Sequence, residues 1–278
     1  HLTWKSLFNR RTTVLLTLFS IALSTALLLG VERIRTEARS SFANTISATD
    51  LVVGGRGGAI QLLLYSVFHI GNATNNISWT SYQEIASNPK VAWTIPLSLG
   101  DSHQGYRVLG TSETFLKHYR YGRKHPLELA VGTPFKDLYD TVLGAEVADR
   151  LGYRLGQEMI VAHGTGKVSF SKHSDKPFRV AGILKRTGTP VDRTVLVSLE
   201  AIEAIHVDWR SGAPLPGVHV SPDQTRQMDL TPRTITATLV GLKSRAAVFQ
   251  VQRFVNEYAA EPLSAVMPGV ALQELWDM

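Results

Sequence analysis

Two glycine-containing segments have residue types that could bind a nucleotide phosphate. His163 to Val168 (HGTGKV) has the lysine of a phosphate-binding loop, but position 161 is not glycine and no Ser or Thr follows Lys167. Gly54 to Gly58 follows a predicted strand, as a dinucleotide-binding turn would, but the third glycine and a ribose-binding acid are missing. We therefore predict a hairpin turn for the first segment and a flexible loop for the second.

The other residues that often carry chemistry show no ordered spacing. The nine histidines are scattered without the paired spacing of metal ligands, and the sequence has no cysteine. Neither an HExxH nor a GxSxG motif occurs. The sequence therefore predicts no catalytic residue, no metal site and no cofactor bound by this chain, and it excludes disulfides and thiol catalysis.

Half of the net charge of +6 lies in the first eleven residues. Residues 1–11 hold three basic residues and no acid, which leaves 26 basic and 23 acidic residues in the rest of the chain. Such a balance argues against nucleic acid as a partner. The basic segment Lys117 to His125 with its interleaved aromatics is interpreted as a solvated loop, with an anionic partner or a lipid headgroup as the alternative.

An uncharged, mostly apolar stretch runs from Thr12 to Val31. Twenty helical residues at about 1.5 Å each span about 30 Å, the thickness of the hydrocarbon core of a bilayer. A cleaved signal peptide is the alternative, but the apolar run is longer than its usual core and no small-x-small site follows directly. We therefore predict a transmembrane helix. Three basic residues flank it on each side, so charge leaves its orientation open.

Small hydroxyl side chains form one stripe along this predicted helix. They are Thr13, Thr17, Ser20 and Ser24, at spacings of four, three and four residues. Such residues let membrane helices approach closely and bond across an interface. Alternatively, each hydroxyl bonds its own backbone one turn back. We favour packing against other transmembrane helices, because a lone anchor gains nothing from a stripe.

Beyond the membrane the helix is predicted to continue as a stalk to about Ile46. The residues Ile34, Ala38 and Phe42 recur at four-residue spacing, with charged residues on the other faces. This pattern is typical of a helix that leaves the bilayer and enters a folded domain.

A second apolar run, Ile60 to Ile70, is too short to span a membrane. Its large side chains cover most of a helix circumference, which is typical of a buried helix. The alternative is an exposed surface that engages an adaptor, a partner domain or a lipid-like cargo. The residues of that candidate surface are Leu62, Leu63, Tyr65 and Phe68.

Two strand–helix–strand units are predicted, one on each side of a long central segment. The first has a strand at Asp50 to Val53, a helix at Thr80 to Ser87, a strand at Val91 to Leu99 and a hairpin partner at Tyr106 to Gly110 across GDSHQG; the second has a strand at Ile235 to Val240, a helix at Arg245 to Tyr258 and a strand at Leu263 to Met267. Two such units pair into one antiparallel sheet with both helices on one face, a ferredoxin-like α+β fold.

The central segment, 113–226, has a different texture, with short strand candidates and loops rich in Gly, Pro and Ser. The strand candidates are Thr141 to Leu143, Met159 to Ala162, Phe178 to Leu184 and Thr194 to Ser198. We interpret this segment as a second, mostly β subdomain inserted into the first.

Four segments carry a resemblance to a known family: KSLFNRRTTVLLTLFSIALSTALLL, DLVVGGRGGAIQLLLYSVFHI, VLGAEVADRLGYRLGQEMIV and FRVAGILKRTGTPVDRTVLVSLEAIEAI. They resemble the FtsX-like permeases, the MacB, LolC and LolE superfamily of type VII ABC transporters. The third segment is the most specific, because a strand ending in Leu-Gly, a helix and then Leu-Gly-Gln recur together in the periplasmic core of that superfamily. The match covers nearly the whole chain.

The resemblance implies a porter-like periplasmic subdomain interrupted by a smaller one called Sabre. The implied arrangement is a cytoplasmic amphipathic segment at 1–11, a transmembrane helix at 12–31, a stalk helix at 32–49, a porter-like subdomain at 50–112 and 227–267, a Sabre-like subdomain at 113–226 and the start of a second stalk helix at 268–278. The family has four transmembrane helices, so we expect this sequence to be truncated after the periplasmic domain.

The resemblance also implies partners and a location. A separate ABC ATPase subunit would bind ATP and Mg²⁺, a second permease copy would complete a homodimer or related heterodimer, and a periplasmic adaptor or lipoprotein could bind outside. The protein would lie in the bacterial inner membrane with its N-terminus in the cytoplasm, and it would act in export or mechanotransmission. A bitopic ligand-sensing receptor and a membrane-tethered enzyme are the alternatives.

Overall fold

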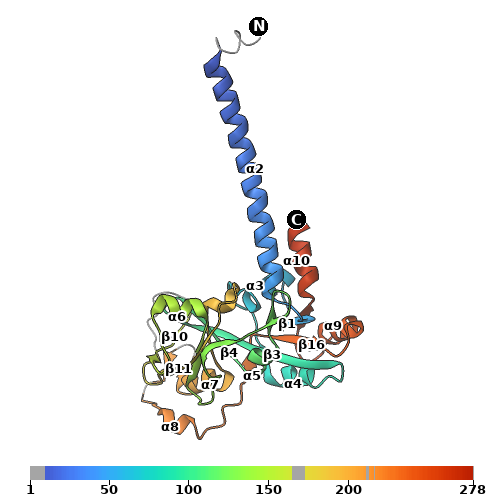
Figure 1. The fold of residues 1–278 in the computed structure, drawn as a ribbon. Coiled ribbons are helices and arrows are strands. Elements are labelled where there is room, and N and C mark those ends of the chain that lie inside the picture. Colours follow the sequence, from blue (N-terminus) through green and yellow to red (C-terminus); the bar gives the residue numbers. More distant parts are fainter. Residues whose placement is uncertain (1–9, 165–172, 211–212, 216, 278) are drawn as a thin grey trace. The chain divides into compact units, whose positions relative to one another are not determined.

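The computed structural model describes residues 10–164, 173–210, 213–215 and 217–277. The chain divides into two compact units, His1–Phe42 and Ala43–Met278, and the boundary falls inside one helix (Figure 1). The expected turn at His163 to Val168 falls mostly outside the described residues, as do residues 1–9 of the predicted amphipathic segment.

The first unit is dominated by helix α2, Arg11–Thr45, which runs without interruption for 35 residues (Figure 1). Its part Arg11–Glu37 is long and apolar enough to cross a membrane, and none of its apolar window is buried. Large aliphatic side chains such as Leu16 and Leu28 are about 70% exposed, which in a water-soluble helix would be costly and in lipid is favourable. The expected continuation of the helix to about residue 46 is confirmed.

The second unit is built on one mixed sheet. Its central path follows the order β17-β1-β16-β3-β4-β12-β8-β11-β7, with β10 paired to β3 and β9 to β11. The strands are β1 (Leu51–Gly55), β3 (Val91–His103), β4 (Tyr106–Thr111), β7 (Leu129–Gly132), β8 (Asp140–Leu143), β9 (Glu158–Met159), β10 (Ala162–His163), β11 (Phe178–Leu184), β12 (Thr194–Ser198), β16 (Ala237–Leu242) and β17 (Leu263–Val266). Three two-residue pairs lie outside this sheet: β2 (Ile77–Ser78) with β15 (Thr234–Ile235), β5 (Arg120–Tyr121) with β6 (His125–Pro126), and β13 (Trp209–Arg210) with β14 (Ala213–Pro214).

The helices of the second unit are short. They are α3 (Ala59–Ser66), α4 (Trp79–Ala86), α5 (Glu113–His118), α6 (Ala145–Leu151), α7 (Leu199–His206), α8 (Pro222–Thr225), α9 (Val248–Asn256) and α10 (Pro268–Asp277), with 3₁₀ turns η1 (Pro190–Arg193) and η2 (Arg245–Ala247). The predicted helix start at Pro268 is confirmed. Helix α4 is capped by Ser78, whose hydroxyl accepts the amide of Ser81, so the helix begins one residue earlier than the expected start at Thr80.

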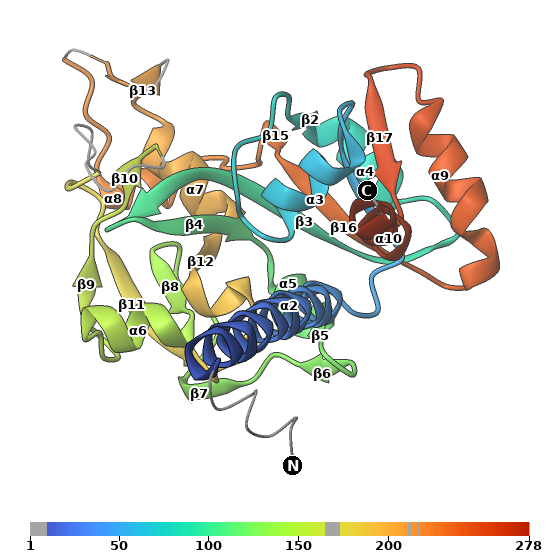
Figure 2. The same cartoon turned by 90° about the horizontal axis from the view of Figure 1, so that it is seen from above.

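One half of the sheet, β17-β1-β16-β3, has the ferredoxin-like order with every neighbouring pair antiparallel. Leu51 and Val53 of β1 share a buried cluster with Ile85 of α4 and with Val251 and Val255 of α9. Both crossover helices therefore cover the same face of the sheet, as the two predicted strand–helix–strand units required. Figure 2 shows α4 and α9 together with these strands.

Helix α3 packs on the opposite face of β1. A side chain at Gly54 would place its Cβ 2.5 Å from Leu62 Cδ1 and 2.6 Å from the Tyr65 hydroxyl, so these two side chains would have to shift to admit it. The expectation of a flexible glycine loop is therefore wrong for Gly54 and Gly55, which are the last residues of β1.

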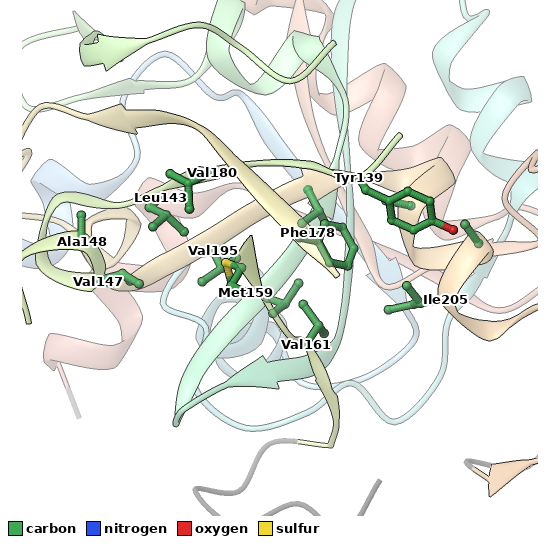
Figure 3. Close-up of a cluster of buried hydrophobic side chains, with 14 residues drawn as sticks. Tyr139, Leu143, Val147, Ala148, Met159, Val161, Phe178, Val180, Val195 and Ile205 are labelled. Atoms are coloured by element: carbon green, nitrogen blue, oxygen red, sulfur yellow. The ribbon is translucent and has the colours of Figure 1, made fainter. Parts of the chain in front are cut away.

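The other half of the sheet, β4-β12-β8-β11-β7, encloses a second apolar cluster (Figure 3). Its members include Val195 of β12, Phe178 and Val180 of β11, Val147 of α6 and Ile205 of α7. The pairs β4–β12 and β8–β11 are parallel, so this half is a mixed sheet. Val108 of β4 belongs to this second cluster, although the sequence placed that strand with the first subdomain.

Strand β3 joins the two halves. Its residues from Val91 to Leu97 pair with β16, and its later residues pair with β4 and β10. The connection GDSHQG was expected to be a loop, but the strand continues through His103 and the turn is only Gln104 and Gly105, with φ of +48° and +87°. As a result Asp101 lies in a strand.

Candidate functional site

The hydroxyl stripe of the membrane helix lies on exposed positions of α2. The Thr17 hydroxyl donates to the Thr13 carbonyl at 2.9 Å, which is the backbone bond that the alternative interpretation predicts. Packing of the stripe Thr13, Thr17, Ser20 and Ser24 against other membrane helices stays a prediction.

The predicted stalk residues lie on the same helix. Ile34 is 70% exposed, and ion pairs joining Arg33 to Glu37 and Arg35 to Glu32 support the surrounding turns. Ala38 and Phe42 belong to α2, but their side chains lie outside the described residues.

The candidate partner surface on α3 is buried. Leu62, Leu63, Tyr65 and Phe68 are all less than 10% exposed, whereas Ile70 at the end of the run is 58% exposed. The interpretation of these four side chains as an exposed surface is therefore wrong, and core burial is correct. The reason is that α3 uses both its faces, one against β1 and another against α10.

Residues 44–47, near the start of the second unit, are hydrogen-bonded to the segment after α5. The Tyr119 hydroxyl donates to the Thr45 carbonyl, the Ser47 amide donates to the Arg120 carbonyl at 2.9 Å, and the Gly122 amide donates to the Asn44 carbonyl at 2.7 Å. Tyr119 is fully enclosed and burial raises its pKa, so its hydroxyl stays protonated. We call these residues the stalk joint. The basic segment predicted as a solvated loop therefore includes a buried tyrosine and a small hairpin.

Four titratable side chains converge at one end of β3. They are Asp101 of β3, His163 of β10, His173 just before β11, and His206, the last residue of α7; we call them the Asp–His cluster. Asp101 and His163 are directly opposite each other in the antiparallel β3–β10 pair. Sequence reasoning found no grouping of histidines, because these residues come from three distant segments.

The second apolar cluster holds two of these histidines in place. Val161 and Ile205, both labelled in Figure 3, are fully buried in that cluster, two residues before His163 and one residue before His206. The backbone of His173 is fixed by its amide, which donates to the Val161 carbonyl at 2.9 Å. The histidines are therefore positioned by a packed core.

The ligand atoms of the cluster face one another closely. Asp101 Oδ1 lies 3.2 Å from His163 Nδ1 and 3.6 Å from His206 Nε2, and the two imidazole nitrogens are 3.2 Å apart. His206 Nδ1 lies 2.8 Å from the Ile202 carbonyl, so it carries the proton of the neutral ring and leaves the lone pair of Nε2 facing the cluster.

Burial and the neighbouring charges set the protonation of the cluster. Burial lowers the pKa of His173 to about 4, so this imidazole is neutral at neutral pH. Burial alone would raise the pKa of Asp101, but the imidazoles of His163 and His206 lower it to about 2, so the carboxyl is ionised. In turn Asp101 raises the pKa of His206 against the effect of burial.

A buried ion pair lies beside the cluster. Lys176 Nζ is 2.9 Å from both carboxylate oxygens of Asp208 and 2.9 Å from Asp175, and Lys176 is 0% exposed. Burial would lower the pKa of Lys176, but the two carboxylates raise it above its ordinary value. The Lys176 ammonium thus compensates the negative charges of Asp175 and Asp208.

The comparisons with known proteins agree with this architecture. The family profile of the MacB-like periplasmic core domain matches residues 14–258. The periplasmic region of MacB from Actinobacillus actinomycetemcomitans has the same fold, with a TM-score of 0.50 and 11% identity over 84% of this chain and 95% of that one. The extracellular domain of the noncanonic ABC-type transporter YknZ from Gram-positive bacteria aligns at a TM-score of 0.44 and 10% identity over 78% and 98% of the two chains. No curated protein matches the sequence.

The fold and the family define a class: an α+β periplasmic domain of an ABC-transporter-type protein that follows an N-terminal apolar helix. The chain belongs to the MacB-like periplasmic core domain family, whose members are permease components and not the catalytic subunit. The apolar helix and the domain together fit a membrane-anchored protein with a periplasmic domain.

Proposed function

We propose that this chain is part of the permease subunit of a type VII ABC transporter. It couples ATP hydrolysis by a separate ATPase subunit to movement of its periplasmic domain, in export or mechanotransmission. The observation that carries the proposal is the family match, which begins inside the apolar helix and extends to residue 258, so it includes most of that helix and most of the sheet unit. The protein lies in the bacterial inner membrane with its N-terminus in the cytoplasm.

Helix α2 is suited to transmit motion. Its 35 residues extend about 52 Å, of which the bilayer core takes about 30 Å. The helix contains no proline and a single glycine, Gly30, so it lacks the usual cause of a kink. In the proposed mechanism, α2 carries the movement of the membrane part to residues 44–47.

The stalk joint passes that motion into the sheet unit. Three hydrogen bonds link residues 44–47 to residues 119–122, and the Phe115 and Tyr119 rings stack at 4.8 Å between centroids beside β3. Because Phe115 and Tyr119 are buried, the joint moves with the core and not independently of it.

The partners follow from this mechanism. A separate ATPase subunit binds ATP and Mg²⁺, and a second permease copy, identical or related, completes the membrane part. The stripe Thr13, Thr17, Ser20 and Ser24 is the surface through which α2 packs against other membrane helices. A periplasmic adaptor or lipoprotein binds the sheet unit.

The first experiment is purification of the complex from native membranes in detergent, with mass spectrometry of the bound chains and an ATP hydrolysis assay. An ABC ATPase that co-purifies in stoichiometric amount supports the proposal. Purification of this chain without any ATPase, under conditions that keep a dimer intact, would overturn it.

The second experiment tests the transmission of movement through α2. Gly30→Pro removes a backbone hydrogen bond and kinks α2, whereas the matched control Gly30→Ala preserves it. We expect the proline variant to hydrolyse ATP with at least tenfold lower transport or mechanical output, and the alanine variant to match the wild type. Equal output from both variants would contradict transmission through α2.

A further inference from the structure

We propose that Asp101, His163, His173 and His206 bind one divalent transition-metal ion, with Zn²⁺ as the ion that the geometry fits best. The four ligand atoms all lie within 4.8 Å of one another. Three imidazoles and one carboxylate are ligands that zinc commonly takes in proteins.

The distances match a tetrahedral ion. With bonds of about 2.0–2.1 Å, two ligand atoms on Zn²⁺ stand about 3.3–3.4 Å apart. The three separations among Asp101 Oδ1, His163 Nδ1 and His206 Nε2 are 3.2, 3.2 and 3.6 Å. Three of the ligand atoms thus already have the spacing of a tetrahedral site, and the ligand atom of His173 lies within 4.8 Å of each of them.

Buried polar atoms of the cluster that lack a hydrogen-bond partner support a bound metal ion. His173 is 0% exposed, and neither of its ring nitrogens has a hydrogen-bond partner among the described residues. Asp101 Oδ1 is also without a hydrogen bond of proper geometry there. A buried polar atom without a partner is costly and needs an explanation, and a metal ion bound by the imidazole and the carboxylate provides one.

A hydrogen bond outside the cluster also orients one of its ligands. The bond between His206 Nδ1 and the Ile202 carbonyl orients the imidazole and fixes Nε2 as the ligand atom. Such a bond to a backbone carbonyl is the usual support of a metal-binding histidine. His163 and His206 remain partly exposed, at 39% and 25% of their side chains, so an ion can reach the cluster from solvent.

The neighbouring group of Asp175, Asp208 and His219 is a weaker candidate for a cation. Its two carboxylates already hold the Lys176 ammonium at 2.9 Å, which would repel a second positive charge. The Asp–His cluster is therefore the better cation site, and His219 provides a matched control.

The test uses the full chain without an affinity tag, in detergent, after treatment with chelator. Zinc is added, the sample is dialysed, and zinc per chain is measured by elemental analysis and by competition with a chromophoric chelator. We expect one equivalent of Zn²⁺ in the wild type and in His219→Ala, and binding at least about 100-fold weaker in His163→Ala and His206→Ala. Wild-type protein that retains no zinc would overturn the proposal, as would unchanged binding in both cluster variants or loss of binding in His219→Ala.

A second measurement keeps the test valid if a variant fails to fold. Wild-type protein loaded with Co²⁺ should show the intense visible bands of a tetrahedral ion and quench the emission of Trp209, whose ring lies 4.1 Å from that of His173. Trp209→Phe should remove the quenching and keep the visible bands. The weak bands of octahedral Co²⁺, or quenching that persists in Trp209→Phe, would contradict a site at these residues.

Discussion

The two halves of the periplasmic unit differ in what they bury. In the ferredoxin-like half the buried polar side chains of the described residues are hydroxyls, such as Ser81, Thr94 and Thr238. In the other half they include charged and titratable groups, and all of these lie between residues 101 and 208: Asp101, His103, Asp140, His173, Lys176, Asp192 and Asp208. One half is held by apolar packing, whereas the other also depends on specific polar contacts.

The two halves should therefore respond differently to substitution. An apolar core tolerates small changes in shape, and its stability depends on volume. Buried ions require particular partners in particular places, and removal of one partner leaves the other uncompensated. We therefore expect mutations in the first half to act through packing, and mutations in the second to act through charge.

The largest effect is expected for Asp208→Ala in the second half. It leaves the buried Lys176 ammonium with Asp175 alone and also removes the carboxylate that accepts the Val220 amide. We expect the free energy of unfolding to fall by about 3–5 kcal/mol in urea titration, because an uncompensated buried charge remains. Asp223→Ala, at an exposed acid paired with Arg226, is the control and should leave stability unchanged. A small loss of stability in Asp208→Ala would contradict the dependence of the second half on buried charge pairs.

The corresponding change in the first half is Ile85→Ala. Ile85 is fully buried between α4 and the sheet, so its truncation leaves a cavity. We expect a loss of about 2–5 kcal/mol in the same urea titration, with the same value from pH 5 to pH 8 because no charge is involved. Phe249→Ala, at an exposed position of α9, should have little effect. A pH-dependent loss in Ile85→Ala would contradict a purely apolar first half.

A moderate effect with a pH signature is expected for Asp140→Asn. The Asp140 carboxylate accepts the amides of Lys136 and Asp137 at 3.0 Å and pairs with Arg179 at 2.8 Å. Burial alone would raise the pKa of Asp140, but these amides and Arg179 lower it below 3.8. The folded protein therefore holds this proton less tightly than the unfolded chain, so the stabilisation is complete above pH 3.8 and is lost as the pH falls through the lowered pKa.

We expect Asp140→Asn to lower the free energy of unfolding by about 1–3 kcal/mol at pH 7. The difference between variant and wild type should shrink as unfolding is measured at progressively lower pH toward 3. Glu128→Gln, which breaks an exposed pair with Lys185, is the control and should show neither effect. A difference that is constant with pH would show that the Asp140 charge is not responsible.

The smallest expected effects come from two matched helix caps. The Ser78 hydroxyl caps α4 in the first half, and the Ser198 hydroxyl caps α7 in the second by accepting the Ala201 amide. Each change to alanine should cost about 1 kcal/mol in thermal or urea unfolding. Only Ser198→Ala should also weaken zinc binding, because α7 carries His206 at its other end. Equal zinc affinity in both variants would show that zinc binding does not depend on how α7 is positioned.

The ferredoxin-like half of the fold was also easier to predict from the sequence than the mixed half. Leu51 and Val53 of β1, Ile85 of α4 and the Val251–Val255 pair of α9 obey local periodicity, so the ferredoxin-like half could be assembled from its pattern. In the second half the strand segments near Val142, Val180 and Val195 were also predictable, but their mixed order was not, because parallel and antiparallel neighbours have the same alternation. The burial of α3 depended on its packing against both β1 and α10, and α10 begins more than 200 residues after α3 ends.

The amino-acid sequence by itself determined the membrane helix, the ferredoxin-like units and the family, because each depends on apolar residues at short, regular spacing. The Asp–His cluster and the stalk joint were decided only by the tertiary structure. Asp101 meets His163 through the pairing of β3 with β10, and His206 arrives there because α7 packs on the core through Ile205. Such convergence depends on strand order and helix packing, and no local spacing of residues encodes it.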